Sequence, residues 1–339
     1  MRSYGRGYRG TRCKPFSTGH KSPRVVLSLN PDFTFNHPIF DTHIHGIDPD
    51  SLDLLVGIQE KYGIQKAVLI CHSPAITEYA RSTYPGRFIF AKYFSGAMRF
   101  TEGPHNLAQE VLAAAEEGYD LVKMQSAPVM RARAKADPGE LRLDGDEMSP
   151  MFEAVIDANI PFMLHLSDPD TYYASRYTDI DYFGTKERDL EELEGVLSKY
   201  PEIRFQIAHF AAQPEIHRLD NLSRWFDTYK NFNIDTGSAR WVSRELSKDV
   251  ERASDFMNRH SDRIQFGTDC VAFTDDSNYY NGRHLALRLL LESSVRNVPL
   301  PFQDADTVNS GGTRINGLDL EKDVLQKIYW DNACEFYGI

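Results

Sequence analysis

The run Phe40-Asp41-Thr42-His43-Ile44-His45 mixes apolar and polar residues in a way that is typical of a β-strand. Side chains two positions apart on a strand lie on the same face, so His43 and His45 are predicted to project together, close enough to bind one metal ion. A His-x-His pair also arises by chance, because so short a motif carries little information. Its meaning therefore depends on whether the rest of the chain supplies further ligands.

Seven more short apolar runs follow at regular intervals, and amphipathic segments separate them. This alternation is typical of repeated βα units with a parallel sheet. The eight predicted strands cover residues 40–45, 66–71, 88–94, 121–125, 162–166, 205–210, 231–236 and 264–270.

The count and length indicate an α/β protein with a single (β/α)8 TIM barrel. An open doubly wound sheet is the main alternative. It would normally carry a Gly-rich phosphate loop after its first strand, whereas His45 is followed here by Gly46-Ile47-Asp48-Pro49. We therefore expect a barrel domain at 38–339, preceded by a basic and flexible arm at 1–37.

The composition favours a small-molecule partner. The chain has 339 residues, with 49 acidic and 38 basic side chains and a net charge of −11, which argues against general binding to nucleic acid or to an anionic membrane. The four cysteines form no Cys-x-x-Cys pair, and no apolar run reaches the roughly 18 residues that span a bilayer. We expect a cytoplasmic protein, and a homodimer.

Polar residues that can bind metals recur at the predicted carboxyl ends of strands. In a barrel these ends converge on one mouth, where several polar groups crowded together need an ion or a substrate to satisfy them. The residues in question are His43, His45, Lys123, His165, His209 and Asp269.

This constellation resembles the amidohydrolase superfamily. The start Phe-Asp-Thr-His-Ile-His, the Ala-His-Phe of 208–210, the Phe-Gly-Thr-Asp of 266–269 and the Trp-Asp-Asn-Ala of 330–333 look most like its amidohydrolase-related branch. That branch includes hydrolases and non-oxidative decarboxylases of the aminocarboxymuconate-semialdehyde type. The resemblance covers roughly residues 38–339.

The resemblance implies a metal site and a catalytic pair. His43, His45, His165 and Asp269 would hold one divalent cation, zinc in the first place and manganese as the alternative. Asp269 would then exchange a proton with a metal-activated water and with the leaving group, and His209 would orient the water or polarise the substrate.

Four further residues are predicted to contact the substrate. Lys123 is expected to meet a substrate anion, although in some branches a carboxylated Lys on this strand bridges a second metal, which we regard as the less favoured alternative. Arg240, in the turn after the seventh strand, is expected to bind a carboxylate. His72 and Tyr173 complete the predicted substrate contacts, and other arginines near strand ends, Arg99 among them, are weaker candidates.

Two reactions remain open. The first is hydrolysis of an amide, lactone or ester bond in a small carboxylate-bearing substrate by a metal-dependent hydrolase. The alternative is metal-dependent, non-oxidative decarboxylation of a small, and potentially aromatic, carboxylic acid. A barrel that only binds ligands is the third and least favoured hypothesis, because the ligand set is intact.

Overall fold

A computed structural model describes residues 33–137 and 139–339. Most of the predicted basic arm, residues 1–32, lies outside the described residues. Within them, no helix combines the length and the apolar character needed to cross a membrane.

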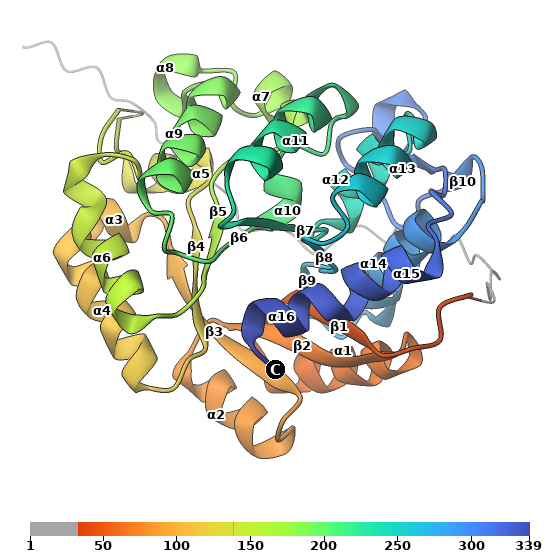
Figure 1. Ribbon diagram of the computed structural model, residues 1–339, viewed down its shortest axis with the longest axis horizontal. Coiled ribbons are helices and arrows are strands. Elements are labelled where there is room, and N and C mark those ends of the chain that lie inside the picture. The colour runs from red at the N-terminus through yellow and green to blue at the C-terminus, as the bar shows by residue number, and fades with distance from the viewer. Residues whose placement is uncertain (1–32, 138) are drawn as a thin grey trace, which may run out of the picture.

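Nine parallel strands form one curled sheet in the order β8-β7-β6-β5-β4-β3-β2-β1-β9, and Figure 1 shows the helices arranged around its outside. The strands are β1 Ile39–Gly46, β2 Ile64–Cys71, β3 Phe88–Ser95, β4 Leu121–Gln125, β5 Phe162–His165, β6 Phe205–Ile207, β7 Phe232–Asp235, β8 Ile264–Gln265 and β9 Cys270–Ala272. A separate antiparallel pair joins β10 Val298–Pro299 and β11 Arg314–Ile315.

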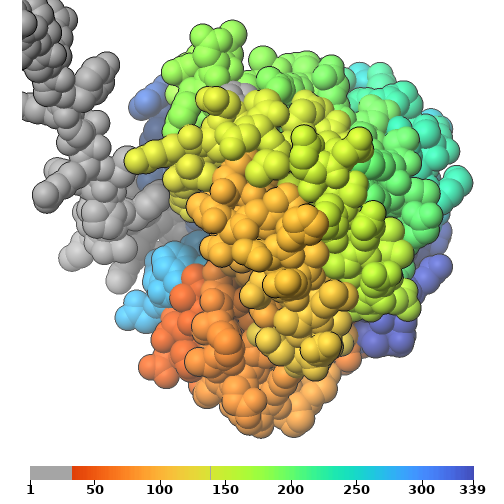
Figure 2. Space-filling view, turned by 90° about the vertical axis from the view of Figure 1, so that its left-hand side faces the viewer, coloured from red at the N-terminus to blue at the C-terminus, as the bar shows by residue number. Residues whose placement is uncertain are grey.

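The longer helices mostly connect consecutive strands. They are α1 Pro49–Lys61, α2 Pro74–Thr83, α4 Pro104–Glu116, α6 Ser149–Ala158, α9 Lys186–Lys199, α11 Leu219–Thr228, α12 Ala239–Leu246, α13 Val250–Arg259 and α14 Ser277–Glu292. Shorter helices are α3 Met98–Thr101, α5 Pro128–Ala134, α7 Asp170–Ser175, α8 Ile180–Phe183, α15 Lys322–Gln326 and α16 Asn332–Tyr337, with a π-helical turn at Lys327–Asp331. Figure 2 shows one side of the molecule covered by the orange and yellow part of the chain, to which α2, α3 and α4 belong.

Local sequence explains where the helices begin. The side chain of Asp48 accepts a hydrogen bond from the backbone N–H of Ser51, and Pro49 occupies the first turn of α1. Ser73 and Pro74 do the same at α2. A side-chain acceptor satisfies an N–H group that has no partner within the helix, and proline has no such group to satisfy.

The predicted eighth strand is divided in two, so the sheet has nine strands instead of eight. β8 pairs with β7, whereas β9 pairs with β1, so segment 264–272 joins both ends of the curled sheet. Between them, Thr268 donates from its backbone N–H and its hydroxyl to the buried carboxylate of Asp41, at 3.0 and 2.6 Å. Asp269 follows with a φ of 52°, which interrupts the strand.

The predicted sixth strand is also shorter than expected. β6 ends at Ile207, because His209, Phe210, Ala211 and Ala212 all adopt left-handed backbone conformations, with φ between 51° and 58°. Such conformations cost non-glycine residues about 1–2 kcal/mol each. No hydrophobic pattern announces this turn, which the prediction of 205–210 therefore missed.

Apolar packing fills the sheet interior at its N-terminal end. Phe40, Ile89 and Leu121 lie at the starts of their strands and form one buried cluster, against which Trp330 and Tyr337 of the C-terminal segment pack. The polar residues are thereby left to the opposite end, where strands finish.

Close approach of β3 and β4 predicts a stability difference between two glycine substitutions. In Gly96→Ala the new Cβ would lie 2.4 Å from the carbonyl oxygen of Gln125, so we expect a loss of about 1–3 kcal/mol in the free energy of unfolding. Gly57 in α1 has no heavy atom within 4 Å of such a Cβ, and Gly57→Ala should gain about 0.5–1 kcal/mol. Urea unfolding measures both, and equal effects would contradict the packing described.

Candidate metal centre

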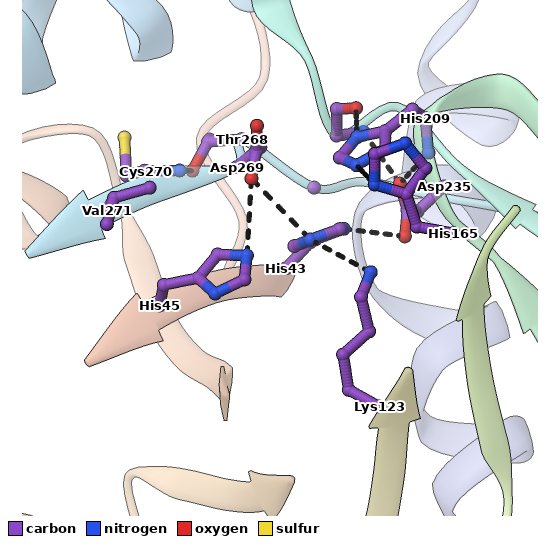
Figure 3. A network of polar contacts seen from close by, with 12 residues as sticks. His43, His45, Lys123, His165, His209, Asp235, Thr268, Asp269, Cys270 and Val271 are labelled. Atoms are coloured by element: carbon purple, nitrogen blue, oxygen red, sulfur yellow. Dashed lines mark hydrogen bonds and ion pairs between the residues drawn. The ribbon is translucent and has the colours of Figure 1, made fainter. Parts of the chain in front are cut away.

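The predicted polar residues gather at the carboxyl end of the sheet, as Figure 3 shows. β1 supplies two imidazoles, β4 a lysine, β5 and the turn after β6 one imidazole each, β7 a carboxylate, and the break between β8 and β9 another carboxylate. In the same order the residues are His43, His45, Lys123, His165, His209, Asp235 and Asp269.

His43 is oriented by a carboxylate that the sequence analysis did not single out. Its Nδ1 lies 3.0 Å from Oδ2 of Asp235, and both side chains are fully buried. An Nδ1–H that donates to a carboxylate leaves the Nε2 lone pair available for another partner, which is the arrangement seen in metal-binding histidines. Nε2 of His43 faces Oδ1 of Asp269 at 3.6 Å.

His45 meets the same oxygen from the other side. Its Nε2 lies 3.4 Å from Oδ1 of Asp269, while its Nδ1 contacts Nε2 of His72 at 2.8 Å. Burial, as the leading cause, lowers the pKa of His45 to about 3. His45 is therefore neutral at physiological pH, the form in which imidazole binds metals.

These separations fit a metal ion. His43, His45 and Asp269 each offer one ligand atom, all within 4.8 Å of one another. Ligands at zinc-type bond lengths on a tetrahedron stand about 3.4 Å apart, close to the observed 3.4 and 3.6 Å. A second close group, His43, His209 and Asp235, is instead connected by internal hydrogen bonds to Asp235.

Asp269 is held as an anion. Burial alone would raise the pKa of its carboxyl, but the hydrogen bond from His45 and the neighbouring His209 and His43 outweigh burial, and the pKa lies well below its usual range. The left-handed backbone at this position, anchored by a 2.8 Å hydrogen bond from its N–H to the carbonyl of His43, directs the carboxylate toward the two β1 imidazoles.

His209 is fixed at both its backbone and its ring. Its backbone N–H donates to Oδ1 of Asp235 at 2.9 Å, and Nδ1 contacts the carbonyl oxygen of Gly237. A carbonyl can only accept, so Nδ1 carries the proton. Burial and the adjacent His165 hold the pKa of His209 well below its usual value, which leaves Nε2 unprotonated.

The structure places His165 beside the three close ligand atoms rather than among them. Its Nδ1 lies 3.2 Å from Nε2 of His209, and its Nε2 lies 3.2 Å from Oδ1 of Asp168. Both ring nitrogens thus have polar neighbours. Of the four predicted ligands, the structure brings three together and sets the fourth against His209.

Lys123 lies at the floor of the site. Its Nζ is 3.5 Å from Nε2 of His43. Burial lowers the pKa of its ammonium to about 8, partly offset by Asp235 and Asp269. The two carboxylates that favour the charged form of Lys123, Asp235 and Asp269, lie on either side of His43.

A cavity of about 630 Å³ opens above these residues. Of the predicted substrate contacts, Lys123, His72 and Arg240 line this cavity. Tyr173 does not, because its hydroxyl contacts Ser167 and Asp189. The neighbouring aromatic residues Tyr172, Tyr177, Phe183 and Trp241 form the apolar wall instead.

Arg99 is likewise outside the site. It is 1% exposed and pairs with Glu192 at 3.1 Å. A charge so deeply buried needs a partner, so its role is structural.

Asp168, Asp235 and Arg283 are residues of this site that were missed from the sequence. Asp235 ends a strand, as His165 does, and the same positional rule could have identified it. Arg283 also lines the cavity, but it comes from the middle of α14, where a helical arginine resembles any surface cation.

Comparisons with known proteins agree on the fold. Two 5-carboxyvanillate decarboxylases are similar in structure. The one from Novosphingobium aromaticivorans, complexed with manganese and 4-hydroxy-3-methoxy-5-nitrobenzoic acid, has a TM-score of 0.52 at 14% identity over 90% of this chain and 97% of the other. The enzyme from Sphingomonas paucimobilis has a TM-score of 0.51 at 11% identity over 90% and 100%. No curated protein matches the chain.

The family follows from a sequence match. A family model described as Amidohydrolase matches residues 98–339. The match begins after β1, so it does not include the His-x-His pair of that strand. Since it covers well over half of the residues, the chain belongs to the amidohydrolase family.

Proposed function

We propose that this protein is a metal-dependent enzyme that removes CO2, without oxidation, from a small aromatic carboxylic acid. The observation that carries the proposal is the cavity itself, whose lining combines the aromatic side chains of Tyr172 and Trp241 with cations and with the candidate ligands His45 and Asp269. A flat ring fits such a wall. The similar structures described above include decarboxylases of a carboxylated aromatic acid, which supports this choice. We further infer that the curled sheet is a (β/α)8 barrel with an eighth strand that is interrupted at Asp269.

We assign His43, His45 and Asp269 as metal ligands, and His165 as a fourth on the basis of its place at the end of β5. Imidazole and carboxylate donors suit zinc and manganese alike. A divalent cation held there would polarise substrate oxygen atoms and lower the pKa of bound water.

Asp269 is the proton carrier in this proposal. It rests as a carboxylate, so it must first take up a proton, which water in the open cavity can supply. As the bond between the ring carbon and the carboxylate breaks, its electron pair takes the proton from Asp269. CO2 leaves, the carbon keeps the proton, and Asp269 returns to its anionic form.

Hydrolysis is the second candidate, and one observation favours it. Nε2 of His209 is unprotonated and lines the same cavity as Asp269. A neutral imidazole in that position can accept a proton from water that attacks an ester, amide or lactone. Both reactions would use the same carboxylate-binding cavity.

Product analysis separates the two reactions. Protein supplied with Mn²⁺ or Zn²⁺ is incubated with a panel of hydroxybenzoic acids, and released CO2 is measured. Matched aryl esters, anilides and lactones are followed by release of acid. We expect CO2 from at least one aromatic acid, and turnover of the second panel alone would favour the hydrolase instead.

Asp269→Asn tests the proton carrier. An amide keeps the shape of the side chain but cannot relay a proton, so we expect turnover to fall by at least ~10²-fold, while circular dichroism and thermal unfolding stay close to wild type. Asp276→Asn is the matched control, because Asp276 caps α14 at an exposed position and asparagine caps equally well. Activity retained in Asp269→Asn would move the acid–base role to His209.

Metal content tests the ligand set. By elemental analysis, purified protein should hold about one divalent cation per chain. His45→Ala should lower this content strongly, because it removes one of the four proposed donors. His105→Ala, an exposed histidine of α4, should leave it unchanged. Metal-free wild-type protein that gains no activity with added metal would contradict the proposal.

A further inference from the structure

Four arginines stand near the mouth of the cavity, and they differ in what already neutralises them. Arg176, Arg240 and Arg244 come from α7, α12 and the residues beside them. Arg283 comes from α14 and lies 3.9 Å from Asp269. An arginine that recognises a substrate anion must have charge and N–H donors to spare, so the partners of each group decide its role.

The first group forms a closed network with carboxylates of the loop between β10 and β11. Arg244 donates to Asp304 and Asp306, each at 3.0 Å. Arg176 donates to Asp306 at 3.1 Å. Arg244 also donates to Glu245 at 2.7 Å, so three guanidinium groups face three carboxylates.

Arg240, the arginine predicted from the sequence to bind the substrate, belongs to this network. Its Nη2 donates to the hydroxyl of Tyr172 at 2.6 Å, and its Nε lies 3.6 Å from Asp304. These contacts fix the tyrosine in the cavity wall. A substrate carboxylate at Arg240 would have to compete with side chains that are already in place.

Among the described residues Arg283 donates no hydrogen bond to a carboxylate, and Asp269 is its one ionic partner. Its one hydrogen bond there runs from Nη1 to the carbonyl oxygen of Thr268, at 3.4 Å. The nearest carboxylate is Asp269, at 3.9 Å, beyond hydrogen-bond distance. If Asp269 binds a cation as proposed, that negative charge is used elsewhere.

The guanidinium of Arg283 is nevertheless held in position. It lies over the ring of Tyr279, 4.7 Å from the centroid, and the two residues are one helical turn apart on α14. Tyr279 is itself anchored, since its hydroxyl accepts from the backbone N–H of Val271 at 3.3 Å. Lys123, another cation that lines the cavity, is already influenced by Asp235 and Asp269, whose charges partly offset the effect of burial on its pKa.

We propose that Arg283, and not Arg240, binds the carboxylate of the substrate. This inference rests on the proposed function only in taking the substrate to be a small carboxylic acid. Arg240 then acts as a positioning residue, which holds Tyr172 against the ring. The carboxylate is recognised next to Asp269, by a guanidinium that is not part of the three-arginine network.

Binding measurements test the assignment without any turnover. Benzoate and its neutral analogue benzamide are titrated calorimetrically into protein as purified, for wild type, Arg283→Met, Arg283→Lys and Arg240→Met. We expect Arg283→Met to lose about 10- to 100-fold in benzoate affinity, as for a charged hydrogen bond, with benzamide unaffected. Arg283→Lys should recover part of the loss. Arg240→Met acts on the ring through Tyr172, so it should change the affinities for benzoate and for benzamide by the same factor.

Three outcomes would overturn the assignment. They are unchanged benzoate affinity in Arg283→Met, a loss in Arg240→Met that falls on benzoate and not on benzamide with a wild-type melting temperature, and wild-type protein that does not prefer benzoate to benzamide. Failure of the proposed reaction looks different. In that case benzoate still binds through Arg283, but no aromatic acid releases CO2.

Discussion

The buried carboxylate of Asp235 is the group on which the geometry of the site depends. It accepts hydrogen bonds from Nδ1 of His43, from Nε2 of Gln206 at 2.7 Å and from the backbone N–H groups of His209 and Gly237 at 2.9 and 2.8 Å. Burial, the largest single effect, would raise the pKa of Asp235, but His43, His209 and Lys123 together outweigh it and hold this pKa below its usual range. Asp235 therefore remains ionised. Its carboxylate fixes the tautomer of His43 on β1 that carries the proton on Nδ1, and it holds the left-handed turn at His209 after β6. The same crowding explains why glycine occupies position 237, since a Cβ there would lie 2.7 Å from both Asp235 and His43.

A second buried carboxylate, Asp41, explains why the last strand breaks where it does. Asp41 draws Thr268 toward β1 through two hydrogen bonds, and the backbone turns at the next residue to present Asp269. Burial raises the pKa of Asp41 to about 7. The fold thus places directly behind the site a carboxyl group whose ionisation is opposed by burial. Hydrogen bonds from the hydroxyl and the N–H of Thr268 lower its pKa and offset part of that effect. Backbone strain of this kind is tolerated where the surrounding contacts determine it.

The sequence predicted what periodicity and strand ends encode. Alternating apolar runs located the strands to within a few residues, and the rule that strand ends converge brought together His43, His45 and Asp269. Hydropathy could not reveal the left-handed turn at His209, because that turn depends on a hydrogen bond to Asp235, which is distant in the chain. For the same reason Tyr173 and Tyr172 were indistinguishable. Adjacent residues on a helix such as α7 point about 100° apart, and only the buried partner Asp189 shows that Tyr173 turns away from the cavity.

The availability of charged side chains to a ligand was the property that was hardest to predict from the sequence. An acidic chain with arginines near many strand ends suggested several anion-binding residues, yet a guanidinium is available to a ligand only if its own neighbours leave it so. The loop between β10 and β11 lies some sixty residues beyond Arg240 and Arg244, and its Asp304 and Asp306 convert both arginines from ligand-binding groups into parts of the wall. Arg283 is not neutralised in this way, because its nearest carboxylate is that of Asp269. In the proposed site this carboxylate would bind the metal. The selectivity of the cavity would thus depend on which guanidinium groups are already paired with carboxylates of the protein. A substrate acid would bind at Arg283, where the positive charge is least neutralised.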